Sequence, residues 1–127
     1  MSTLKVNTLE EATVGGATFF TAKAWVNFNG TGTVAIRDDG NVSTITDYGT
    51  GNYGVNFSNS LSSSNYVTSS DSNGLNTSTT LNSQTAIFAS LNGGSDPTTS
   101  AFRLVAGNSA NASTKQDKTF FHVMAVL

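Results

Sequence analysis

The side chains that could do acid–base or nucleophilic chemistry are few, and His122 is the only histidine of the chain. A Ser–His–acid triad is formally possible because Ser and Asp are plentiful, but the nucleophile-elbow pattern G-x-S-x-G does not occur. His122 stands within an apolar segment near the C-terminus, where a lone histidine is usually a hydrogen-bonded core or interface residue. The sequence therefore favours a structural role for His122 over a catalytic one.

Glycoside hydrolysis requires two carboxyl groups close together in space. The candidates considered for such a pair are Asp38, Asp39 and Asp47. All three lie around sequences that predict tight turns, where Asp is common because its side chain hydrogen-bonds the local backbone. The segment 38–41 resembles part of a calcium loop but lacks the closing acidic ligand, and the segment 49–51 lacks the Lys and helix of a phosphate loop. We expect no catalytic, cofactor-binding or metal-binding residue, and no enzymatic activity.

The composition excludes several classes of protein. Ser, Thr, Asn and Gly account for 62 of the 127 residues, and only 11% of the residues are charged, against about a quarter in an average globular protein. Six Lys or Arg against eight Asp or Glu give a net charge of −2, which offers no basic surface for a nucleic acid. The absence of cysteine removes disulfides and thiolate metal sites.

The N-terminal sequence lacks the basic flank and apolar core of a signal peptide. The apolar runs are also far shorter than the ~20 residues that a bilayer requires. We therefore expect a soluble chain made in a cytoplasm, with no membrane insertion.

Apolar side chains are numerous enough for a thin folded core: they make up 37% of the residues and include eight Phe, three Tyr and one Trp. Disorder is the competing interpretation, since Ser, Asn and Gly are abundant. Disordered chains usually carry many charges and prolines and few aromatic residues. This chain has one proline and little charge, which favours a folded domain.

From Ala22 onward apolar residues recur at every second position, the period of a strand with one buried face. Asn29-Gly30, Asp39-Gly40 and Gly49-Thr50-Gly51 each predict a hairpin turn between such strands. Three successive turns predict a meander, whose apolar face carries Ala22, Ala24, Val26, Phe28, Val34, Ile36, Tyr53, Val55 and Phe57.

The second half of the chain gives a weaker pattern. We expect strands near residues 65–69 and 75–81 around a loop at Ser69–Gly74, the alternative being one long flexible loop over residues 58–84. The remaining expected elements are a short strand at Ala86–Ser90, a turn at Asn92–Pro97, a strand with Phe102, Leu104 and Ala106 on one face, a polar loop at Gly107–Lys118 and a closing strand at Thr119–Val126. Residues 22–127 are thus predicted to form an all-β antiparallel β-sandwich of about eight strands, with no helix longer than two turns.

The closing strand is apolar on both faces, with Phe121, Val123 and Ala125 alternating with Phe120, His122, Met124 and Val126. A strand with two apolar faces is covered on both sides, and a sandwich of this size covers one of them with its own core. We therefore predict a homo-oligomer whose subunit contacts are made by Trp25, Phe120, His122 and Met124.

Residues 1–21 are predicted to form an attachment arm, joined to the 22–127 head by a hinge at Gly15-Gly16. A short helix over Thr8–Ala12 is possible within this arm. The alternative is a frayed terminus, since the first residues of a domain are commonly disordered. The residues expected to dock the arm are Leu4, Val6, Leu9 and Val14.

A series of short motifs carries a resemblance to a known family. The motifs are Lys23–Phe28, Ile36-Arg37, Asn41-Val42-Ser43, Gly49-Thr50-Gly51 and Tyr53–Phe57, together with STLKVNT at residues 2–8 and the closing TFFHVMAVL. They resemble segments of tail-fibre and tail-appendage proteins of marine and cyanobacterial bacteriophages. Residues 62–100 carry no part of the resemblance.

The resemblance implies a non-enzymatic virion structural protein, a β-rich homotrimeric head displayed to a host-surface glycan or protein. The arm would hold the head to other virion proteins, and the short arm without a shaft leaves the tail, baseplate and capsid all open as its position. The alternatives are a capsid decoration or fibre-joining protein without receptor contact, and a polysaccharide depolymerase domain, which the lack of paired acids disfavours.

Overall fold

The computed structural model describes residues 2–5, 21–73, 96–108 and 111–127. Within these residues the chain is all-β: nine strands are present and no helix, so none that could span a membrane. The strands are β1 Ala22–Asn29, β2 Ala35–Gly40, β3 Val42–Asp47, β4 Asn52–Phe57, β5 Val67–Asn73, β6 Ala101–Val105, β7 Gly107–Asn108, β8 Asn111–Lys115 and β9 Phe120–Val126.

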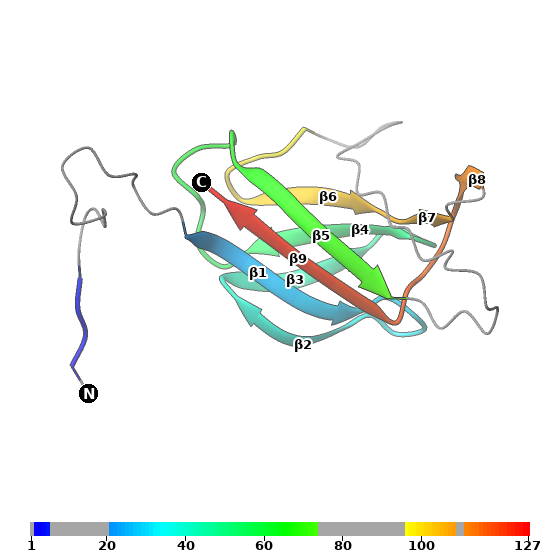
Figure 1. Ribbon diagram of the computed structural model, residues 1–127, viewed down its shortest axis with the longest axis horizontal. Helices are drawn as coiled ribbons and strands as arrows, with labels where there is room; N and C mark the ends of the chain where they lie inside the picture. The colour runs from blue at the N-terminus through cyan, green and yellow to red at the C-terminus, as the bar shows by residue number, and fades with distance from the viewer. Residues whose placement is uncertain (1, 6–20, 74–95, 109–110) are drawn as a thin grey trace, which may run out of the picture.

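The main strands form two antiparallel sheets that pack against each other (Figure 1). One sheet has the order β2-β1-β9-β5 and the other has the order β3-β4-β6, while β7 and β8 form a separate two-stranded hairpin. In Figure 1 the four-stranded sheet crosses in front of the three-stranded one. This arrangement is consistent with the predicted β-sandwich, in which two inner faces share one core.

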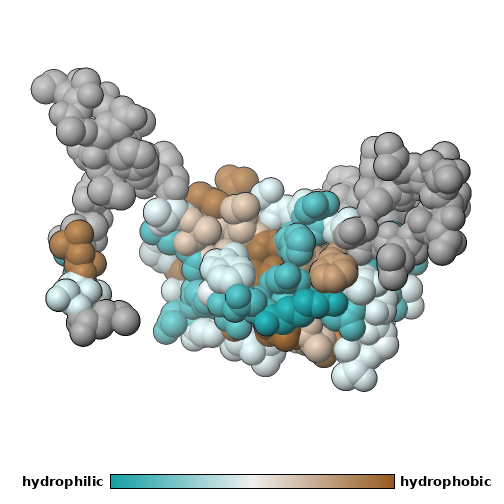
Figure 2. All heavy atoms as spheres, turned by 60° about the horizontal axis from the view of Figure 1, so that its bottom comes forward, coloured by the Kyte–Doolittle hydropathy of each residue, from teal (hydrophilic) through white to brown (hydrophobic). Residues whose placement is uncertain are grey.

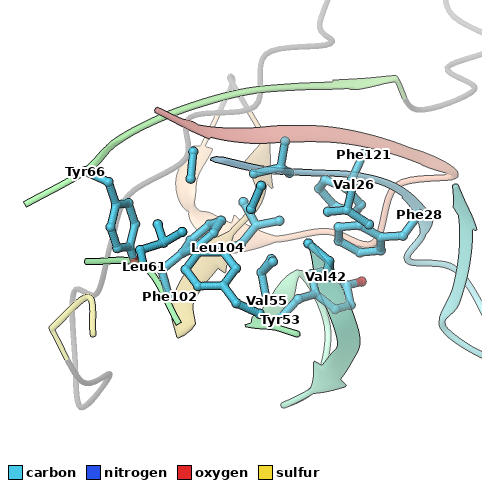
Figure 3. Close-up of a cluster of buried hydrophobic side chains, with 14 of the residues drawn as sticks. Val26, Phe28, Val42, Tyr53, Val55, Leu61, Tyr66, Phe102, Leu104 and Phe121 are labelled. Atoms are coloured by element: carbon cyan, nitrogen blue, oxygen red, sulfur yellow. The ribbon is translucent and has the colours of Figure 1, made fainter. Parts of the chain in front are cut away.

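One cluster of aromatic rings joins the sheets at one end of the core (Figure 3). Phe28 of β1 stacks on Phe121 of β9 with the ring centroids 4.7 Å apart. Tyr53 of β4 meets both rings edge-on, at 5.4 and 5.2 Å. All three side chains are fully buried, so this cluster removes a large apolar area from water and fixes the distance between the sheets.

A second aromatic cluster joins the sheets at the other end of the core. Phe57 of β4 and Phe102 of β6 lie 5.9 Å apart, and the ring of Tyr66, just before β5, lies 5.7 Å from Phe57 and 6.1 Å from Phe102. Leu61 and Leu104 are buried in the same core. Six of the fifteen buried hydrophobic residues in the described core are thus aromatic.

The Tyr53 hydroxyl and the Asp117 carboxylate connect the loop that begins at Gly30, the turn that contains Gly51 and the segment between β8 and β9. The Tyr53 hydroxyl lies 2.7 Å from the Gly30 carbonyl oxygen and 2.5 Å from an Asp117 carboxylate oxygen, and its single proton can be donated to either of these acceptors. The same Asp117 oxygen accepts a hydrogen bond from the Gly51 backbone N–H at 2.7 Å. Burial, and next the hydrogen bond to Asp117, raise the pKa of Tyr53 well above its usual value, so the hydroxyl stays protonated.

The predicted hairpin turn at Asp39-Gly40 is wrong, and with it the meander. β2 continues through Gly40, and the chain then crosses from the four-stranded sheet to the three-stranded sheet at Asn41, which has a φ of 61°. The Asn41 side chain fixes this crossing, because its Nδ2 donates to the Lys23 and Asn59 carbonyls and its Oδ1 accepts from the Asn59 N–H. Asparagine tolerates the left-handed region better than other non-glycine residues.

Two expected loops contain strands. The loop expected at Ser69–Gly74 is mostly the second half of β5, and the polar loop expected at Gly107–Lys118 contains the β7-β8 hairpin. The hairpin expected after Asn29 is present, but Asn29 still belongs to β1 and the connection to β2 is the loop 30–34. The turn at Gly49-Thr50-Gly51 and the strands that contain Phe102 and Phe121 are confirmed. The strands expected at 75–81 and Ala86–Ser90 lie outside the described residues.

The variant Tyr53→Phe tests the hydroxyl that joins the loops. We expect its free energy of unfolding to fall by about 1–3 kcal/mol at neutral pH, because the variant lacks the donor that lies between the buried Gly30 carbonyl and the Asp117 carboxylate. The difference from the wild type should shrink above pH 10, where the unfolded tyrosine ionises while the folded one, with its raised pKa, does not. Urea unfolding at both pH values measures this, and equal stability at neutral pH would contradict the role of the hydroxyl.

Candidate interaction surface

The predicted two-sided pattern of the closing strand is present in β9. Phe121, Val123 and Ala125 point inward and are buried, whereas the side chains between them point outward and are exposed. Of these outward residues, Phe120 and Met124 keep 38% and 44% of their surface in contact with water. Since β9 lies between β1 and β5, these apolar groups occupy the middle of the outer face of the four-stranded sheet.

The neighbouring strands extend this apolar surface. Trp25 of β1 lies opposite Met124 and is 41% exposed, and Val67 at the start of β5 lies opposite Val126 and is 71% exposed. Four of the six large exposed hydrophobic residues among the described residues therefore lie on this one sheet face. Figure 2 shows that apolar residues (brown) also reach the surface beside a band of hydrophilic residues (teal). We call the outer face of the four-stranded sheet the apolar face.

A row of polar side chains crosses the apolar face from edge to edge. The strand register aligns Asp38 of β2, Asn27 of β1, His122 of β9 and Asp71 of β5. Within the described residues, the Asn27 Oδ1 atom is buried and lacks a hydrogen-bond partner. The His122 side chain lies on the exposed side of β9, on the same face as Phe120 and Met124, and its predicted part in a subunit contact stays a prediction.

A hollow of about 510 Å³ lies over the part of this row from Asn27 to Asp71 and over the apolar residues beside it. Its walls are largely apolar, which suits a protein partner better than a strongly hydrated ligand. Its side chains come from β1, β5 and β9 and include Trp25, Asn27, Ser69, Asp71, His122 and Met124.

The Trp25 indole occupies space on the apolar face that is open only because Gly40 has no side chain. Gly40 is the register partner of Trp25, and a Cβ atom at Gly40 would overlap the indole Nε1 and Cδ1 atoms. At the other end of the face, the Arg37 guanidinium stacks 4.1 Å from the centroid of the Phe120 ring. Glycine and arginine thus position the two largest exposed rings of this surface.

The acidic residues considered for catalysis serve the local backbone instead. Asp39 accepts a hydrogen bond from the Val42 N–H at 3.3 Å, Asp38 from the Asp39 N–H at 3.0 Å, and Asp47 from the Gly49 N–H at 2.8 Å. No group of three or more acidic, cysteine or histidine residues that could hold a metal ion occurs in the part of the chain that the structure describes.

His122 has Asp71 across from it and Ser69 nearby, which are the residue types of a triad. Such catalysis also needs donors for a developing oxyanion. The backbone groups of β9 are instead committed to ladder hydrogen bonds with β1 on one side and β5 on the other. The exposed position of His122 in a largely apolar hollow favours a binding surface.

The other predicted positions are only partly described. Leu4 of the predicted arm is 87% exposed, and Val6, Leu9, Val14 and the Gly15-Gly16 hinge lie outside the described residues. Val67 lies in the strand expected near residues 65–69 and Asp71 in the expected loop, but neither is predicted as part of an interaction surface. The adjacent apolar residues Tyr66 and Val67 indicate a strand in which one side chain points inward and the other outward.

Comparison with known proteins found no matching family model, no similar curated protein and no similar solved structure.

The variant Gly40→Ala tests the packing of the Trp25 indole against Gly40. The added methyl group must push the ring away from β2, which exposes more of it to water. Because Trp25 is the only tryptophan, we expect a red-shifted emission maximum and stronger quenching by acrylamide. Ala35→Gly, a change at an exposed position of the same strand, is the control. Unchanged emission in Gly40→Ala would contradict the described packing.

Proposed function

We propose that the chain is a self-assembling, non-enzymatic structural subunit of a bacteriophage tail-fibre-like appendage, whose head meets a receptor on the host surface. The observation that carries this proposal is the apolar face of the four-stranded sheet. The motifs of residues 22–61 and the closing strand, which resemble phage tail-appendage proteins, supply the biological setting. The virion is accordingly the proposed location.

The physical reason for assembly is the cost of leaving this face in water. Each Å² of apolar surface removed from water contributes about 25 cal/mol, and large rings and methionine are the residues that most often anchor interfaces. Trp25, Phe120 and Met124 form such a set on rigid strands, with His122 between the latter two. Copies of the same chain are the simplest cover, and a homotrimer is the state that the phage resemblance favours.

Assembly can be followed through Trp25, the only tryptophan. We expect its emission to shift to the blue as protein concentration rises, because a second copy excludes water from the indole. Met124→Lys should abolish the shift, since assembly would bury an ammonium group. Thr50→Lys, which adds the same charge in the exposed turn before β4, should leave the shift unchanged. A concentration-independent emission in the wild type would contradict the interface.

Attachment to the particle is proposed for the N-terminal arm through Leu4, Val6, Leu9 and Val14. Deletion of residues 2–16 should leave a folded head that no longer joins the particle. Antibody labelling of whole particles by electron microscopy tests this, with label expected on the tail for the intact chain and none for the deletion. Label over the capsid shell would instead favour a decoration protein, and continued incorporation of the deleted chain would refute the role of the arm.

A further inference from the structure

The outer face of the three-stranded sheet differs from the apolar face in chemistry. Its outward residues are mostly hydroxyl and amide side chains of β3 and β4, and its one large exposed ring, Tyr48, keeps 54% of its surface in water. A hollow of about 180 Å³ opens beside this ring. Its side chains include Tyr48, Asn56, Asp96, Thr98 and Arg103.

The floor of this hollow is built by a fixed aromatic ring. Tyr48 lies over Gly54, where an added Cβ atom would come within 2.9 Å of the ring. The Arg103 guanidinium stacks 3.9 Å from the centroid of the Tyr48 ring, and its Nε donates a hydrogen bond to Asn52 Oδ1 at 3.2 Å. The ring and the guanidinium therefore hold each other in place before any ligand arrives.

The rim of the hollow is also preorganised. The Thr98 Oγ1 atom accepts a hydrogen bond from the Ala101 N–H at 3.0 Å. From inside the core, the Tyr66 hydroxyl lies 3.0 Å from the Thr98 carbonyl oxygen and 3.1 Å from the Ala101 carbonyl oxygen. On the other side, the Asn56 Nδ2 group donates to the Thr46 hydroxyl at 2.9 Å. A ligand that binds here does not have to pay for ordering these walls.

We propose that this hollow binds a neutral saccharide unit. The Tyr48 ring offers an apolar surface for sugar C–H groups, while the Asp96 carboxylate accepts hydrogen bonds from hydroxyl groups and Arg103 donates to sugar oxygens. Among the described residues, one cation and one anion line the hollow, so this lining offers no net charge to attract an acidic sugar. This inference deepens the proposed function, on which it rests for the choice of the face left exposed after the apolar face is covered.

The test is saturation-transfer NMR and titration of the full chain with neutral monosaccharides: glucose, galactose, mannose and N-acetylglucosamine. Glucuronic acid and N-acetylneuraminic acid serve as acidic comparators. We expect millimolar binding of at least one neutral sugar, at least tenfold tighter than either acid. Tyr48→Ala and Asp96→Asn should each weaken it tenfold or more. Tyr48→Phe, which keeps the ring, and Asp39→Asn, an exposed aspartate on β2 of the other sheet, should bind as the wild type does.

Three results would overturn the inference: no binding of any neutral sugar, tighter binding of an acidic sugar, or binding that survives both Tyr48→Ala and Asp96→Asn. The retained binding of Tyr48→Phe separates loss of the ring from loss of the fold. Failure here is distinct from failure of assembly, because the oligomeric state is measured separately. A chain that assembles but binds no neutral sugar refutes this site alone, and a monomer that binds sugar refutes the assembly alone.

Discussion

The position of β9 between β1 and β5 is the constraint on which the rest of the structure depends. Both edges of β9 are hydrogen-bonded, so the strand cannot turn to hide both of its apolar faces. Its inward residue Phe121 stacks on Phe28 and meets Tyr53 of the opposite sheet, which commits that face to the core. The outward residues Phe120 and Met124 then necessarily face water until another molecule covers them.

The outer faces of the two sheets share one packing arrangement but differ in the kind of surface that it forms. On each, an aromatic ring lies over a glycine of the neighbouring strand: Trp25 over Gly40, and Tyr48 over Gly54. Trp25 has Met124 as its register partner and belongs to a broad apolar surface, whereas Tyr48 has Arg103 stacked on it and belongs to a small, mixed hollow. The neighbours of the ring, more than the ring itself, decide whether the surface suits a second copy or a hydrated ligand.

Strands with clear alternation could be predicted from the sequence because burial of one face determines them, as in the strands that contain Val26, Tyr53, Phe102 and Phe121. β5 could be predicted only at its start, near residues 65–69, since its Ser- and Thr-rich remainder forms a strand through the ladder that β9 offers. The hairpin turn predicted at Asp39-Gly40 is wrong for a similar reason, because Gly40 pairs with Trp25 of β1 and so belongs to β2. The exposed positions of Trp25, Phe120 and Met124 followed from alternation, whereas the hollow around Tyr48 depends on contacts between strands distant in sequence.

Sedimentation equilibrium of the unmodified chain over a range of concentrations tests the central claim most directly, namely that the outer residues of β9 require a second copy of the chain. We expect a molar mass of at least twice 13.2 kDa, with three times as the value that the phage resemblance favours. A folded species of 13.2 kDa at every concentration would contradict it, because Trp25, Phe120 and Met124 would then be stable in water without a partner.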